Sequence, residues 1–217
     1  MAELDPPLTH ALEAARAVII KRHVVADQWP SAPTAIGAES LLDGAFHGTL
    51  PEGPILVRLS AWRAVKKIVG SASSRIGLVI SGGDALAGIT DNWNDFGLVA
   101  IEFSSAADGR GFSLARLLRE RYGYRGELRA VGASASGGVF TRDQLAYLER
   151  VGFDAFVLRE GEDVHAALGA FHSFSYAYQA TVQQPTPLYR ARHGLVPPHQ
   201  VPALKHDDSW ATLTSPS

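Results

Sequence analysis

The densest group of residues able to do chemistry lies between Asp108 and Gly132, where the chain reads DGRGFSLARLLRERYGYRGELRAVG. Five glycines, six arginines and two tyrosines fall in this run, which contains no lysine. A planar guanidinium binds carboxylates, phosphates or sulfo-oxyanions through paired N–H donors, and glycine allows a backbone to approach a ligand closely. The run therefore predicts either an anion-binding site or a packed junction built from the same residue types.

Two loops in this region are placed to meet a ligand. In parallel α/β proteins, ligands bind beyond the carboxyl ends of the strands, and a helix start offers free N–H groups to an anion. The first loop is Ser104–Gly111, and the second, Ala133–Gly138, follows the next predicted strand. Neither matches a known phosphate or dinucleotide motif. The anion- or partner-binding candidates are Gly109, Arg110, Gly111, Ser113, Arg129 and Gly132, with Asp108 as the candidate catalytic group.

Each candidate also has a structural interpretation, which the sequence leaves open. Asp108 can cap a turn and pair locally with Arg110. Glu102 and Arg129 lie in otherwise apolar strands, and a structural ion pair between them is the favoured reading, because buried charges need partners. The remaining helix arginines fit a solvated face better than a binding site. These are Arg116, Arg119 and Arg121.

The elements that must position these residues alternate along the chain. Five short apolar runs bounded by turn residues predict strands, and a hairpin or edge pair is expected within Ala17–Val25. Between the strands, Leu114, Leu117, Leu118 and Tyr122 share one helical face, and Thr141 with Gln144 forms a capping-box pattern. The strand candidates are Ile55–Leu59, Ile76–Ser81, Leu98–Phe103, Glu127–Val131 and Ala155–Leu158.

This alternation predicts an α/β fold. The expected architecture is a mainly parallel sheet of about five or six strands with right-handed βαβ crossovers. So few strands cannot close an eight-stranded barrel, so the sheet is expected to be open or an incomplete, barrel-like arc. We expect a polar lead-in over residues 1–16, one α/β domain over 17–180 and an extended Pro-rich tail over 181–217.

Composition excludes several classes of function. Hydrophobic residues make up 46% of the chain and the net charge is −2, which argues against a nucleic-acid or anionic-membrane partner. The chain contains no cysteine, so thiol catalysis and cysteine-ligated clusters are excluded, and a reducing cytoplasm is the expected location. No signal peptide or membrane span is expected. The scattered histidines predict no metal site, and no cofactor motif is evident.

Together these residues resemble the bacterial family catalogued as domain of unknown function 934. The resemblance rests on Asp108–Ser113 and Leu117–Gly132, with further matches at Gly152–Phe156 and Tyr178-Gln179. It covers about residues 17–192. Two departures stand out: this chain inserts the loop Ala133–Phe140, and it has Val151 where relatives often have cysteine. The second departure makes a thiol mechanism inapplicable here.

The resemblance implies a pathway. Members of the family are often encoded beside sulfite or nitrite reductase and sometimes carry an oxidoreductase label. The leading hypothesis is therefore an accessory protein of assimilatory sulfite or nitrite reduction that binds the reductase or a small oxyanion. The alternative is a small enzyme of sulfur or nitrogen metabolism that uses Asp108 as acid–base group and Arg110 and Arg129 as anion clamps. A purely structural interaction subunit is a third, less specific reading.

Overall fold

The computed structural model describes the central part of the chain. The described residues are 17–30, 35–42, 45–46, 50, 52–69, 74–90, 92–105, 107–133, 140–172, 178–182 and 184–192. The predicted lead-in over 1–16, most of the loop at 134–139 and the tail beyond 192 lie outside these residues.

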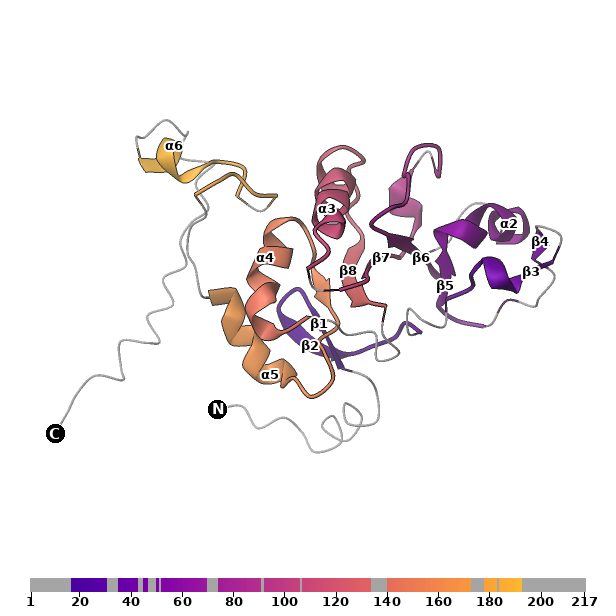
Figure 1. Cartoon of the computed structure of the whole chain (residues 1–217), viewed down its shortest axis with the longest axis horizontal. Helices are drawn as coiled ribbons and strands as arrows, with labels where there is room; N and C mark the ends of the chain where they lie inside the picture. Colours follow the sequence, from indigo (N-terminus) through magenta and orange to yellow (C-terminus); the bar gives the residue numbers. More distant parts are fainter. Residues whose placement is uncertain are drawn as a thin grey trace.

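A seven-stranded sheet in the order β2-β1-β9-β8-β7-β6-β5 forms the centre of the fold (Figure 1). From β5 to β9, neighbouring strands are parallel and follow one another in chain order. The sheet is not closed into a barrel, in agreement with the predicted open or incomplete, barrel-like sheet. Its strands are β1 (Ala17–Ile20), β2 (His23–Ala26), β5 (Ile55–Arg58), β6 (Ile76–Ser81), β7 (Leu98–Phe103), β8 (Glu127–Gly132) and β9 (Ala155–Phe156). A separate two-stranded ladder joins β3 (Leu41–Leu42) to β4 (Ala45–Phe46).

The predicted hairpin forms one edge of this sheet. β1 pairs antiparallel with both β2 and β9, so the hairpin completes the parallel part of the sheet with two reversed strands. Its two-residue turn places Lys21 at φ 48° and Arg22 at φ 66°. Both residues therefore adopt the left-handed conformation that a tight two-residue hairpin turn demands.

The helices pack on one face of the sheet. Alternate residues of each strand point to this face: on β7 they are Val99, Ile101 and Phe103, which join the same apolar core as Trp62 and Leu118. Consecutive strand order with helices on one side is the arrangement that crossovers of a single hand produce. The helices on this face are α2 (Leu59–Val69), α3 (Arg110–Glu120), α4 (Leu145–Arg150) and α5 (Val164–Ala167). A further helix, α6 (Leu188–Arg192), lies apart from them (Figure 1). Short 3-10 turns cover Ala38–Ser40, Trp93–Asp95, Arg142–Gln144 and Leu168–His172.

The opposite face has its own smaller apolar core, which includes Leu98, Ala100 and Val131. A segment that follows β2 covers part of it. Trp29 packs over Gly77, whose added Cβ would lie 3.0 Å from the indole ring. Farther along, Ile36 forms a parallel bridge with Val57 on β5. The chain therefore passes from one edge of the sheet to the other between β2 and Ile36.

Most predicted local features are confirmed. The capping box at Thr141 and Gln144 is present, and Leu114 and Leu118 are buried on the inner side of α3. The last strand is shorter than predicted, since Leu158 forms only an isolated bridge with Phe140. Part of the predicted extended tail is also helical, because α6 begins directly after Pro187, whose fixed φ suits a helix start.

Gly123 lies in the turn that follows α3, where the sequence predicted the helix to stop. Its φ is +63°, a conformation that favours glycine. The reversal brings Tyr124 into the core, where it is fully buried, and the tyrosine hydroxyl donates to the carbonyl of Glu127 at 2.9 Å. The turn therefore connects α3 to the start of β8.

Two glycines at the start of α3, Gly109 just before the helix and Gly111 in its first turn, test this packing. A Cβ on Gly111 would fall against the ring of Phe103 on β7, so we expect Gly111→Ala to lower the free energy of unfolding by about 1–3 kcal/mol. Gly109 has φ −71° and open space around it, so Gly109→Ala should change stability by less than about 0.5 kcal/mol. Urea unfolding measures both, and equal effects would contradict the packing.

Candidate functional site

The carboxyl ends of β6 and β7 bring two loops together. After β6, the backbone N–H of Ser81 donates to the Asp84 carboxylate at 2.7 Å and closes a tight turn. Arg110, at the start of α3, packs over this turn, since a Cβ on Gly82 would lie 2.8 Å from the Arg110 Cβ. This edge is where the fold class predicts a ligand.

Asp108 is held by groups of its own loop. Its carboxylate accepts from the Ser104 hydroxyl at 3.0 Å, from the Arg110 backbone N–H at 3.2 Å and from the Arg110 guanidinium at 2.8 and 2.9 Å. The Arg110 guanidinium holds the pKa of Asp108 well below its usual range. Asp108 is therefore an ionised partner of Arg110 at neutral pH, which disfavours it as a proton donor. Its carboxylate already contacts the first N–H of α3.

The predicted pair between Glu102 and Arg129 is wrong. Glu102 instead receives two hydrogen bonds from Arg58 on β5, at 2.9 and 3.0 Å. The reason lies in the strand register: Glu102 is opposite Val131 and Arg129 is opposite Ala100, so the two charged residues are offset along the ladder. Sequence spacing alone did not reveal this offset.

Arg129 lies inside the sheet's second face, away from the strand ends. Its side chain is 2% exposed, and its Nη1 lies 2.8 Å from a carboxylate oxygen of Asp27, which is 1% exposed. On the other side its Nε donates to Glu127 at 2.8 Å. Burial raises the pKa of Glu127, while the Arg129 guanidinium opposes that rise. Arg129 is thus engaged by two carboxylates and cannot clamp a ligand without losing one of them.

The other predicted site residues are distributed along the same edge. Gly109 and Ser113 are exposed, whereas Gly111 is buried against Phe103. Gly132 is buried at the end of β8, opposite Phe103 in the ladder. The structure thus brings Asp108, Gly109 and Arg110 together, and separates Arg129 from them. The Ser134–Gly138 anion loop lies outside the described residues.

Arg119 was predicted to face solvent, and that prediction is wrong. Its side chain is 10% exposed and forms an ion pair with Asp154 at 3.1 Å. Its guanidinium also donates to the carbonyls of Gly152, Tyr124 and Gly126 at 2.8, 2.8 and 2.9 Å. Burial raises the pKa of Asp154, and Arg119 counteracts that rise. The helical periodicity placed Arg119 on the outward face of α3. Its long side chain nevertheless reaches the turns that lead into β8 and β9.

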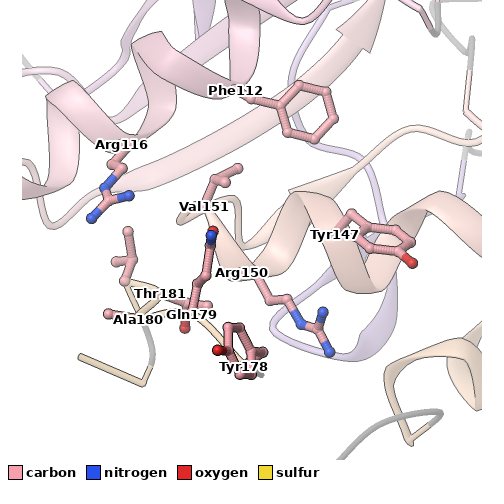
Figure 2. Close-up of a pocket in the computed structure, with 10 residues that line it drawn as sticks. Phe112, Arg116, Tyr147, Arg150, Val151, Tyr178, Gln179, Ala180 and Thr181 are labelled. Atoms are coloured by element: carbon pink, nitrogen blue, oxygen red, sulfur yellow. The ribbon is translucent and has the colours of Figure 1, made fainter. Parts of the chain in front are cut away.

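A groove lies on the helical side of the molecule, between α3, α4 and residues 178–182, and is called the α3–α4 groove below. It has a volume of about 460 Å³. Figure 2 shows Phe112 and Arg116 on one wall, Arg150 and Tyr147 on another, and Tyr178 on the third. Sequence reasoning singled out Tyr178 and Gln179 only through the family resemblance, and missed Arg150 and Tyr147.

The described residues hold no cluster of three or more histidine or acidic side chains placed to bind a metal ion. In the same part of the chain, no helix has the length and apolarity to cross a bilayer.

Comparison with known proteins identifies one family. The family described as "Bacterial protein of unknown function (DUF934)" matches residues 77–189. No curated protein and no solved structure matches the chain. The matched region includes β6 to β9, the Arg119 contacts and the α3–α4 groove.

Two arginines of α3 test the buried contacts. Lysine cannot replace the forked donors of Arg119, so Arg119→Lys leaves buried carbonyls unpaired, and we expect a loss of about 2–4 kcal/mol in the free energy of unfolding. Arg116 pairs with the exposed Glu120, so Arg116→Lys should change stability by less than about 0.5 kcal/mol. Chemical denaturation compares them, and a neutral Arg119→Lys would show that these contacts do not stabilise the fold.

The Asp108–Arg110 pair predicts a pH dependence. Because the pKa of Asp108 is lowered in the folded state, its ionised form stabilises the protein above the unfolded pKa of about 3.9, and this stabilisation is lost as pH falls through the folded pKa. Asp108→Asn should therefore lower the Tm at pH 7, and the difference from the wild type should shrink below about pH 4. Thermal unfolding across pH measures this. A difference that stays constant would contradict the assignment.

Proposed function

The chain belongs to the bacterial family DUF934, and from that premise we propose that it is a non-catalytic accessory protein of assimilatory sulfite or nitrite reduction that binds the reductase. The identity of the partner comes from the gene neighbourhood that the family resemblance implies. The choice of a protein partner over a small oxyanion comes from the arrangement of the arginines.

One observation carries this choice: the two arginines predicted to clamp an anion, Arg110 and Arg129, and also Arg58, are already matched by carboxylates of the same chain. Arg110 binds Asp108, Arg58 binds Glu102, and Arg129 binds both Asp27 and Glu127. An oxyanion binding to any of these arginines would compete with an internal carboxylate held at fixed geometry. These arginines therefore serve to stabilise the fold, which supports binding of a partner protein at another surface over binding of a small oxyanion here.

The alternative is an enzyme in which Asp108 acts as acid–base group and Arg110 and Arg129 clamp an anion. Arg110 keeps Asp108 ionised, and Arg129 is buried away from the strand ends. The two proposed clamps therefore do not face one common space. The geometry supports this alternative less well.

The test is a binding experiment with purified components. Full-length protein immobilised on resin should retain the sulfite or nitrite reductase of the same bacterium, and adding the protein should change the turnover of that reductase, measured as sulfide or ammonia formed. An unrelated acidic protein on the same resin is the control. Absence of retention together with unchanged turnover, for both reductases, would overturn the proposal.

A further inference from the structure

The residues that line the α3–α4 groove have no role in the proposed function so far. Among the lining residues that the structure describes, two are arginines, two are tyrosines and none is acidic. The described walls of the groove therefore combine guanidinium groups with aromatic rings, on a chain whose net charge is −2.

The first cation can exchange its partner. Arg116 pairs with Glu120 at 2.9 Å, but the two side chains are 52% and 48% exposed. An exposed helix pair of this kind contributes only about 0.3–0.5 kcal/mol. A carboxylate arriving in the groove, where it is less hydrated, can therefore compete with Glu120 for the guanidinium.

The second cation is oriented by an aromatic ring. The guanidinium of Arg150 lies over the ring of Tyr147, 5.6 Å from its centre. This cation–π contact favours a position of the guanidinium over the ring. In Figure 2, the guanidinium of Arg150 lies in the part of the groove between Tyr147 and Tyr178.

The groove also offers apolar and polar contacts for a chain. Phe112 and Val151 pack against the core and form an apolar wall. The segment 178–182 is attached to α4 by a hydrogen bond from the Val182 N–H to the Arg150 carbonyl at 3.0 Å. Figure 2 shows the Gln179 side chain directed toward Val151.

The exposed tyrosines argue for a protein occupant. Tyr147 is 54% exposed and Tyr178 is 75% exposed, whereas pockets for small molecules enclose most of their ligand. Exposed tyrosine beside arginine is typical of protein interfaces, where these residues supply most of the binding energy.

We propose that the α3–α4 groove binds a short acidic segment of a partner protein that carries a large aromatic side chain. Carboxylates of that segment bind Arg116 and Arg150, and its aromatic ring lies against the Phe112–Val151 wall and the tyrosines. This deepens the proposed accessory function, on which it rests, because it names the chemistry by which a reductase would be recognised.

The test uses a labelled peptide and the full-length protein. Fluorescence anisotropy should show saturable binding of the peptide GDEWEDG, weakening as salt rises because the contacts are electrostatic. The neutral peptide GNQWQNG and the ring-free peptide GDEGEDG should each bind about tenfold more weakly or worse, since each loses one of the two kinds of contact.

Single substitutions locate the binding. Arg150→Gln, Arg116→Gln and Tyr178→Ala should each weaken binding of GDEWEDG about tenfold while leaving the Tm unchanged. The matched control is Arg63→Gln, an exposed arginine on α2, at the other end of the sheet (Figure 1). Equal weakening by Arg63→Gln would mean a non-specific charge effect and would overturn the proposal.

The chain itself carries an acidic-aromatic segment, with Asp207, Asp208 and Trp210. The double variant Asp207→Asn with Asp208→Asn therefore enters the same titration. If the peptide binds only to this variant, the occupant is the chain's own segment and the partner proposal is wrong. If neither protein binds the peptide, it is also wrong.

The two proposals fail separately. The peptide titration needs no reductase, so retention of the reductase with no peptide binding would reject the groove and keep the accessory function. Peptide binding with no retention of either reductase would keep the groove and reject the named partner.

Discussion

A guanidinium buried in a sheet must be neutralised, and this requirement shapes the whole second face of the molecule. Arg129 sits in β8, in the interior of the sheet, and its partner Asp27 comes from the segment directly after the edge hairpin. Desolvating a lone charge costs several kcal/mol. The ion pair between Arg129 and Asp27 therefore holds the segment after β2 over the sheet. That anchoring lets Trp29 pack over Gly77 and lets the chain reach β5 at the opposite edge.

Arg119 likewise holds separate segments together, at the amino ends of β8 and β9. One side chain on α3 binds the carbonyls of Tyr124, Gly126 and Gly152 together with the carboxylate of Asp154. It thereby ties the turn before β8 to the turn before β9. In this part, the run of glycines and arginines between Asp108 and Gly132 serves packing. The glycines bring the backbone carbonyls close, and the arginine satisfies them.

The arginines of the molecule fall into two groups that differ in their surroundings. At the carboxyl ends of the strands, cations and carboxylates of the chain neutralise one another and stabilise the loops. On the helical side, Arg116 and Arg150 lie beside exposed tyrosines in a groove whose described lining residues include no acid. The accessory role that we propose would use the second group and leave the first intact. Val151 lines this groove and contributes an apolar surface.

The sequence by itself determined the fold class, the hairpin, the parallel strands and the capping of Thr141, because each depends on residues close together in the chain. It also predicted the local Asp108–Arg110 pairing as one of two readings. Tertiary structure decided the partners of Glu102, Arg119 and Arg129. Long flexible side chains choose partners by strand register and by which backbone carbonyls remain unpaired, and neither is encoded in local spacing. The same is true of the groove, whose walls come from three separate segments that only folding brings together.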